Sequence, residues 1–348
     1  MRLLLISKQG AGFGMASHLS SEGHAVTVLH STQSHIGQGV ITVLAQGESV
    51  SAADIYIYDD NSFGQHAEDA RNAGLRVLGA SRWSQMIDDD ESYEAEIIKL
   101  VGWLPPKTSN GVNLYVTGWF NGSKFICSYT SLVYRRLLPG GLGPDVGCMG
   151  TVSNFYQPTD RIYNTFLKPL EKALRRVNHR GCIHIHTLVD GDAFGVQGVS
   201  TALTHPLAYA LLENVNLPVS NILLRLFDEN SKPIRPLEQW ASGVILSVPP
   251  YPYTNPHKPV ELKGLHPSNL KHMWLCDAQK ESGVWKTTGQ TGLVGLVTAR
   301  GSTVEETVRR TYRTISQLDI KDVQYRNDVG RHINPILAKL SKASWIKH

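Results

Sequence analysis

Three closely spaced glycines near the start of the chain lie where a phosphate could bind. Gly10, Gly12 and Gly14 follow a short apolar run at residues 3–7 and precede a helical pattern at residues 15–22. The backbone N–H groups of such a turn point toward the start of the helix, where they can cradle an anion. The spacing is GxGxG rather than GxGxxG, and no acidic residue closes the next strand, so a dinucleotide site is not predicted.

A second set of candidates combines two arginines with a glycine-rich segment. Arg135 and Arg136 could bind an anionic group through their planar guanidinium groups, or they could form surface salt bridges. Residues 139–150 are expected to form a long loop that offers backbone N–H groups to a phosphate or carboxylate. The alternative is a turn whose glycines serve only positive φ angles. The candidate ligand-binding residues of this segment are Gly143, Asp145, Gly147 and Gly150.

Three histidines could in principle form a metal site. His184 and His186 are two residues apart on an expected strand, so both point to one face of the sheet. With His205 they would offer three imidazoles, which suit Zn²⁺, but no cysteine or carboxylate has a matching spacing. Satisfied core histidines, or polar residues on an open sheet face, are the favoured alternative. The acidic run at residues 88–91 is likewise expected to be a solvated helix start, and we predict no metal.

The composition is that of an ordinary globular protein. The 348 residues are 41% hydrophobic and 18% charged, with a formal net charge of +4, and no dense basic run indicates nucleic-acid binding. The four cysteines include no close pair, which excludes a CxxC motif and gives no disulfide framework. Neither a signal sequence nor the roughly 20 apolar residues of a membrane span is recognised, so a cytoplasmic protein is predicted.

Hydrophobic periodicity divides the chain into three regions. Residues 1–106 alternate strands and helices, which predicts an α/β domain with a doubly wound parallel sheet. Residues 107–238 are expected to be α+β, and residues 239–348 a β-rich C-terminal module. The expected strands are residues 3–7, 25–29, 40–44, 54–58, 75–78, 112–117, 124–129, 182–189, 193–198, 242–248, 283–286 and 291–299. The expected helices are residues 15–22, 67–73, 88–99, 161–177, 207–213, 220–226 and 303–318.

Several motifs, in order along the chain, resemble those of phosphoribosylamine–glycine ligases, which are ATP-grasp enzymes of purine synthesis. Residues 132–152, LVYRRLLPGGLGPDVGCMGTV, are similar to that family's HKR…TGPNTGGMG segment. Residues 286–330 are similar to its TNGGRVLCVTALGHTVAEAQKRAYALM…CRKDIG segment. The resemblance implies that Gln290, Thr291 and Gly292 stand where the family's chain approaches its substrate.

Two departures from this family concern ATP. The family's first ATP-clamping subdomain, with its phosphate-binding lysine and mobile glycine loop, has no room before the strand that starts at Val112. The family's VIEFNCRFGDPE strand supplies a Glu and an Asn that hold Mg²⁺. In the corresponding residues 196–206, Gln197 and Val199 take those places. An amide is a poor magnesium ligand and a hydrocarbon is none. The resemblance therefore implies a truncated ATP-grasp core that lacks one subdomain and a conventional ATP site.

Three functional hypotheses follow. The leading one is a degenerate or repurposed homologue of the ligase, which binds a phosphorylated or nucleotide-like ligand or a protein partner and needs no cofactor. The first alternative is an active minimal carboxylate–amine ligase that joins glycine to an amine in purine nucleotide or modified-base synthesis. ATP and Mg²⁺ would be needed only in that case. The second alternative is a structural scaffold. The loops that face phosphoribosylamine in the family differ at residues 10–16 and 58–63, so the original substrate site is not expected to persist.

Overall fold

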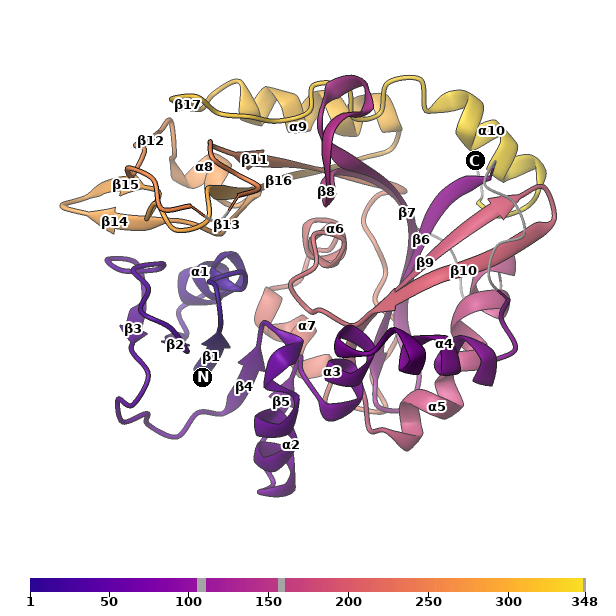
Figure 1. Cartoon of the computed structure of the whole chain (residues 1–348), viewed down its shortest axis with the longest axis horizontal. Coiled ribbons are helices and arrows are strands. Elements are labelled where there is room, and N and C mark those ends of the chain that lie inside the picture. Colours follow the sequence, from indigo (N-terminus) through magenta and orange to yellow (C-terminus); the bar gives the residue numbers. More distant parts are fainter. Residues whose placement is uncertain (105–110, 156–159, 254, 347–348) are drawn as a thin grey trace.

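The computed structural model describes residues 1–104, 111–155, 160–253 and 255–346. Figure 1 shows a small N-terminal sheet on one side, a larger sheet across the rest of the molecule, and helix α6 (Ala208–Glu213) near the centre. A continuous hydrophobic core joins these parts, from Leu3 in the first strand to Trp345 near the C-terminus. Within the described ranges, no helix is both long and apolar enough to cross a membrane.

The N-terminal sheet is fully parallel, with the order β3-β2-β1-β4-β5. This confirms the predicted doubly wound α/β arrangement. From β1 the chain first builds the sheet on one side, through β2 and β3, and then on the other side, through β4 and β5. The strand order therefore reverses between β1 and β4. Such sheets bind ligands at the carboxyl ends of the two strands at this switch point. The elements are β1 (Arg2–Ser7), α1 (Phe13–Ser21), β2 (Ala25–His30), β3 (Thr42–Leu44), β4 (Ile55–Tyr58), α2 (Gly64–Asn72) and β5 (Val77–Leu78).

Two helices, rather than the single predicted one, connect the sheets. The expected helix at residues 88–99 is wrong at its start, because α3 (Arg82–Asp89) ends there and α4 (Glu91–Leu100) begins anew. The break falls at Asp90, whose extended backbone and side-chain bonds to the N–H groups of the following turn make it the N-cap of α4. The prediction of a helix start is therefore confirmed for Asp90 and Glu91 only, because Asp88 and Asp89 end α3.

The larger sheet has eight strands in the order β10-β9-β6-β7-β8-β11-β16-β13. Its first five strands come from the middle of the chain, and β11, β16 and β13 come from the C-terminal third. Because β11 pairs antiparallel with β8, the proposed boundary after residue 238 falls between strands of one continuous sheet. The strands are β6 (Val112–Asn121), β7 (Phe125–Leu138), β8 (Leu142–Phe155), β9 (Arg180–Asp190), β10 (Ala193–Ser200), β11 (Trp240–Ser247), β13 (Met273–Leu275) and β16 (Leu293–Gly301).

The expected glycine-rich loop at residues 139–150 is wrong, because most of it is the strand β8. Only Pro139–Gly141 form the tip of a long hairpin, and pairing between β7 and β8 continues out to Leu138 and Leu142. Gly143 and Gly147 have φ angles of 77° and 80°, which only glycine adopts readily, and the register shifts beside them. The glycines therefore interrupt the pairing as irregularities within a strand and do not open a loop.

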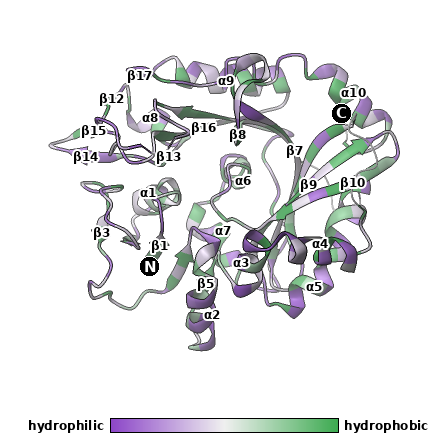
Figure 2. Ribbon diagram, viewed as in Figure 1, coloured by the Kyte–Doolittle hydropathy of each residue, from purple (hydrophilic) through white to green (hydrophobic). Residues whose placement is uncertain are grey.

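The two faces of the larger sheet are covered by different helices. One face, called the inner face, lies against α6. On this face Tyr129 of β7 donates to the carbonyl of Leu207, the residue directly before α6. On the outer face, Ser242 bonds Thr311 of α9 (Val304–Ile315). Figure 2 shows hydrophobic residues alternating with polar ones along β9 and β10, as expected for strands with two different faces.

The remaining elements are short, and two of them differ from expectation. The predicted helix at residues 161–177 is broken: a π turn at Tyr163–Leu167 and a 3₁₀ turn at Lys168–Leu170 precede α5 (Glu171–Arg176), where Pro169 cannot donate a helical hydrogen bond. Helix α10 (Asn334–Lys342) was not predicted. The other elements are α7 (Val219–Arg225), β12 (Leu262–Lys263), α8 (Pro267–Leu270), β14 (Gln279–Glu281), β15 (Val284–Lys286) and β17 (Asp319–Ile320).

Candidate functional site

The glycine turn after β1 is occupied by the protein's own carboxylate. Asp59, at the carboxyl end of β4, accepts hydrogen bonds with Oδ2 from the Gly12 N–H at 2.8 Å and from the Ser7 hydroxyl at 2.5 Å. The Gly10 N–H donates to the same hydroxyl at 2.8 Å. A Cβ on Gly14 would lie 2.8 Å from the backbone of Trp274, so this glycine allows close packing. A phosphate at this turn would have to displace Asp59, and the phosphate-loop role remains a prediction.

Asp59 is a buried carboxyl group whose ionisation should affect stability. Burial raises its pKa to about 6, although the hydrogen bonds from Ser7, Gly12 and Lys8 oppose that shift. Because the folded state holds the proton more tightly than an unfolded chain does, this group favours folding below about pH 4. The contribution is lost as the pH rises through about 6. A difference of about two pKa units corresponds to roughly 3 kcal/mol.

We therefore expect Asp59→Asn to flatten the pH dependence of stability between about pH 4 and pH 7. The amide cannot ionise, yet its oxygen can still accept the bonds from Ser7 and Gly12. Urea unfolding of both proteins at several pH values measures the difference between their free energies of unfolding. That difference should change by about 2–3 kcal/mol across this window. Parallel profiles for the two proteins would contradict the assignment.

The charged side chains of the β7–β8 hairpin bind to groups of the hairpin itself and of the neighbouring strand β6. Arg135 donates through Nε to Asp145 Oδ2 at 2.9 Å and through Nη1 to the Tyr115 hydroxyl at 2.6 Å. These bonds raise the pKa of Arg135 and lower the pKa of Asp145. Asp145 also accepts the Gly147 N–H at 2.9 Å. Arg135 therefore forms a salt bridge with Asp145, which was the alternative to anion binding. Arg136 is exposed and donates to the carbonyl of Gly143 at 3.0 Å.

Glycine 150 has a packing role at the base of the same hairpin. A Cβ on Gly150 would lie 2.4 Å from a methyl group of Val329, which follows the C-terminal Arg326–Asp328 pair. Arg326 is 4% exposed and forms two bonds to Asp328, at 2.9 and 2.6 Å. Arg326 also donates to the carbonyl of Arg136 at 3.1 Å, and Asp328 accepts the Gly140 N–H at 2.8 Å. Arg326 and Asp328 therefore hold the outer part of the β7–β8 hairpin in place through its backbone.

A second buried carboxylate, not predicted from the sequence, organises the segment at residues 288–292. Asp277 is fully buried and accepts the N–H groups of Thr288, Thr291 and Gly292, each at 2.9 Å. Gln290 reaches the N-terminal domain instead, where its amide oxygen accepts the Ser34 hydroxyl at 2.7 Å. Thr291 and Gly292 are thus shaped by Asp277 and do not present free N–H groups, while Gln290 joins the two sheets.

The residues on β10 do not fit a magnesium ion. Gln197 is exposed and sits at a break in the register between β10 and β9, and the Val199 side chain is buried. The carboxylate of Glu94, on α4, is already bound by the Val199 N–H at 2.6 Å. Across the described part of the chain, no three His, Cys, Asp or Glu side chains come close enough to hold a metal ion. Magnesium needs hard oxygen ligands, and this strand offers one neutral amide.

The three predicted histidines meet on the inner face, but not as metal ligands. His184 uses both ring nitrogens, bonding Thr117 Oγ1 at 2.9 Å and the carbonyl of Ala202 at 3.3 Å. The His205 ring lies 4.6 Å from that of His184 between centroids, and the His186 ring stacks on Tyr115. Burial lowers the pKa of all three imidazoles, to about 4 for His186 and His205, so the rings are neutral near pH 7.

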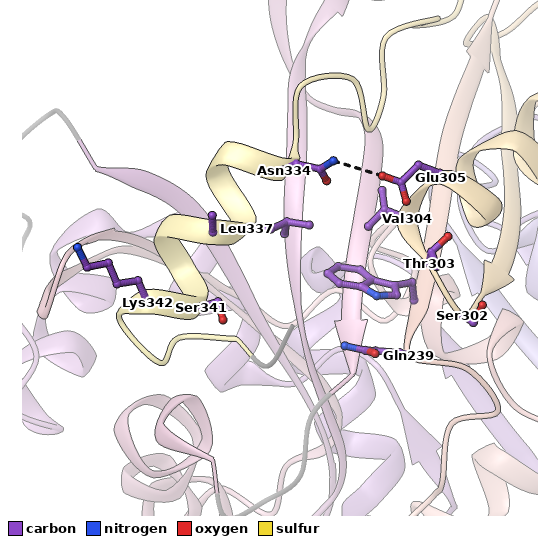
Figure 3. A pocket seen from close by; sticks show the side chains of 11 residues that line it. Gln239, Ser302, Thr303, Val304, Glu305, Asn334, Leu337, Ser341 and Lys342 are labelled. Carbon is purple, nitrogen blue, oxygen red and sulfur yellow. Dashed lines mark hydrogen bonds between the residues drawn. The ribbon is translucent and has the colours of Figure 1, made fainter.

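A groove of about 740 Å³ lies apart from these residues, between α9, α10 and the start of β11 (Figure 3). Its lining combines apolar side chains, including Trp240 and Leu337, with polar ones. Asn334 donates to Glu305 across the groove at 3.4 Å. The groove contains none of the residues that the sequence singled out.

Comparisons with known proteins agree with this architecture. A phosphoribosylamine–glycine ligase from Synechocystis is 26% identical over 256 residues, covering 69% of this chain and 58% of that protein. The enzyme of the same name from Halalkalibacterium halodurans is 22% identical over 302 residues, covering 84% of this chain and 62% of that protein. The chain is similar in sequence to phosphoribosylamine–glycine ligases. The matches span only 54–62% of the curated relatives' own length.

Solved structures show the same fold at low identity. A phosphoribosylamine–glycine ligase from Thermotoga maritima superposes with a TM-score of 0.67 at 15% identity, covering 94% of this chain and all of that chain. A biotin carboxylase domain of a single-chain bacterial carboxylase gives a TM-score of 0.60 at 11% identity, covering 99% of this chain and all of that chain. No protein-family model matches the sequence. The relationship therefore establishes a ligase-type fold, and its chemistry has to be argued from the residues.

Proposed function

We propose that this chain is a small-molecule-binding homologue of phosphoribosylamine–glycine ligase that does not carry out magnesium-dependent ATP chemistry. The observation that carries the proposal is the composition of β10. Exposed Gln197 and buried Val199 stand where the family's Glu and Asn would hold Mg²⁺. Phosphoryl transfer depends on a cation that neutralises the transferring group. These two side chains do not supply the ligands that would hold such a cation.

The connection between the sheets supports the same proposal. Helix α4 ends at Leu100 and β6 begins at Val112, so eleven residues join the N-terminal sheet to the larger one. Residues 105–110 of this connection lie outside the described residues. A segment of that length is much shorter than a folded lobe, since independent domains start near 50 residues. The family's first ATP-clamping subdomain therefore has no room in this connection.

The inner face of the larger sheet is the favoured ligand site. It carries neutral imidazoles beside the Arg135–Asp145 pair, whose opposite charges compensate each other. A compensated surface of this kind suits an uncharged or weakly charged molecule better than a triphosphate, which needs several uncompensated cations.

An ADP-release assay with Mg-ATP, glycine and a panel of amines tests this function. A phosphoribosylamine–glycine ligase of known activity serves as the positive control. We expect no release above the rate without protein, because the described residues include neither the magnesium ligands nor the first ATP-clamping subdomain. Sustained ADP release that depends on glycine and an amine would overturn the proposal and favour an active minimal ligase.

A further inference from the structure

Helix α1 of the N-terminal sheet packs against an aromatic side chain from the C-terminal third of the chain. The His18 ring stacks on the indole of Trp274, with 4.0 Å between centroids and 16° between planes. His18 Nε2 also lies 2.9 Å from the carbonyl oxygen of Met273. A Cβ on Gly14 would lie 2.8 Å from the backbone of Trp274, so α1 and β13 touch directly (Figure 1). His18 thus supplies an aromatic and a polar contact that hold α1 on β13.

The indole on which His18 stacks is buried and held from several sides. Trp274 is 2% exposed, and Tyr209 of α6 stacks on the same indole at 4.6 Å between centroids. The indole Nε1 donates to Thr298 Oγ1 at 3.1 Å, and that hydroxyl donates to Glu213 Oε2 at 2.8 Å. Because these bonds fix the indole, a separation of α1 from β13 would take place between the indole and the His18 ring.

The hydrogen bond to Met273 determines which protonation state of His18 fits this contact. A carbonyl oxygen only accepts, so Nε2 carries the proton of the neutral ring and Nδ1 is left as an acceptor. Nδ1 has no hydrogen-bond partner among the described residues. A second proton would therefore place a charge against the indole without a protein acceptor for the new N–H group. The ring is partly exposed, so water can deliver that proton.

The groups around His18 act in opposite directions, and burial decides the balance. Burial lowers the pKa of His18, and His272 lowers it further. The bond to the Met273 carbonyl and two nearby carboxylates oppose this shift without reversing it, so the charged ring fits the contact less well than the neutral ring. The charged and titratable groups that face the ring are Glu22, Glu213 and His272, with Arg300 bound to Glu213. The other elements packed against α1 carry Arg225 on α7 and His30 on β2.

We propose that His18 is a pH-sensitive latch, whose neutral ring holds α1 on Trp274 and whose doubly protonated ring releases it. A released ring takes its second proton near its ordinary pKa of 6.5, whereas the ring on Trp274 binds that proton less tightly. The latch is therefore complete well above pH 6.5 and weakens as the pH falls below that value. Release loosens the N-terminal sheet from β13, the last strand of the larger sheet. This inference does not depend on the proposed function.

Amide hydrogen exchange of the full chain, corrected for the intrinsic effect of pH, measures the opening of α1. His18→Gln cannot take a proton, but its amide can still donate to the Met273 carbonyl. The ratio of α1 exchange rates at about pH 5.5 and about pH 7.5 should be severalfold larger in the unaltered chain than in this variant. The limit is about tenfold, because a released ring with a pKa of 6.5 is mostly protonated at about pH 5.5. Comparing the two ratios cancels the contribution of Asp59, which both chains share.

Two further variants complete the test. His18→Phe keeps a ring for Trp274 without a titratable group, so it replaces His18→Gln if that variant does not fold, and it should give the same small ratio. His24→Gln changes the neighbouring histidine, whose Nε2 lies 3.8 Å from Glu22, and should keep the ratio of the unaltered chain. Equal ratios in the unaltered chain and in the His18 variants would overturn the latch, and so would a His24→Gln variant that loses the pH response.

Discussion

Replacing Asp277 by alanine should lower the free energy of unfolding by about 3–5 kcal/mol. The carboxylate is fully buried and accepts three backbone N–H groups, each at 2.9 Å, together with the Thr288 hydroxyl. Without it, the N–H groups of Thr288, Thr291 and Gly292 lose their acceptor inside the protein. An unsatisfied buried donor costs about 1–3 kcal/mol, so three of them account for the expected loss.

Urea unfolding measures this loss, and amide hydrogen exchange locates it. The N–H groups of Thr288, Thr291 and Gly292 should lose protection far more than those of the central strands. Asp277→Asn is the matched control, because it retains one acceptor oxygen and should cost clearly less than the alanine variant. An alanine variant that unfolds within about 1 kcal/mol of the unaltered chain would show that water replaces the carboxylate without loss.

Replacing Arg326 by alanine should also cost about 3–5 kcal/mol, because it leaves Asp328 without its buried partner. The guanidinium group is 4% exposed and connects Asp328 to the carbonyl of Arg136. Its loss should free the end of the β7–β8 hairpin while the rest of the sheet stays paired. The effect is expected to be local in exchange measurements and large in the free energy of unfolding.

A double-mutant cycle with Asp328→Ala separates the pair from other packing changes. If the two groups stabilise the hairpin as a unit, the double variant should cost much less than the sum of the single variants. Arg326→Lys keeps the charge but not the two-pronged geometry and should recover only part of the stability. Additive losses, or protection of the hairpin amides in Arg326→Ala, would contradict the role assigned to this pair.

The parts of the fold that sequence could predict are those set by local pattern. The apolar run from Leu3 to Ser7 gives a buried parallel strand because both of its faces are covered, and Gly23 and Gly74 end helices at the expected places. The β7–β8 hairpin was misjudged because its glycines look like loop residues. Their positive φ angles instead create irregularities inside a long strand. Helix α10 was missed because no resemblance covered residues 331–348.

In the candidate site, too, the sequence predicts only the features that a local pattern determines. The inner-face positions of His184 and His186 follow from a period of two along β9, and the structure places both on that face. The roles of Asp59 and Asp277 could not be read locally, because their partners lie up to 52 residues away in the chain. An acidic residue at the carboxyl end of β4, beside a glycine turn at the switch point, was the available signal for Asp59. For Asp277 the sequence offered none.

We propose that a magnesium-bound nucleoside triphosphate does not bind to this chain. Isothermal titration of the full chain with Mg-ATP tests it most directly, with the same titration against a phosphoribosylamine–glycine ligase as the positive control. We expect no saturable heat at ATP concentrations up to about 1 mM, equivalent to a binding free energy weaker than about −4 kcal/mol. Saturable, magnesium-dependent binding in the micromolar range would contradict it.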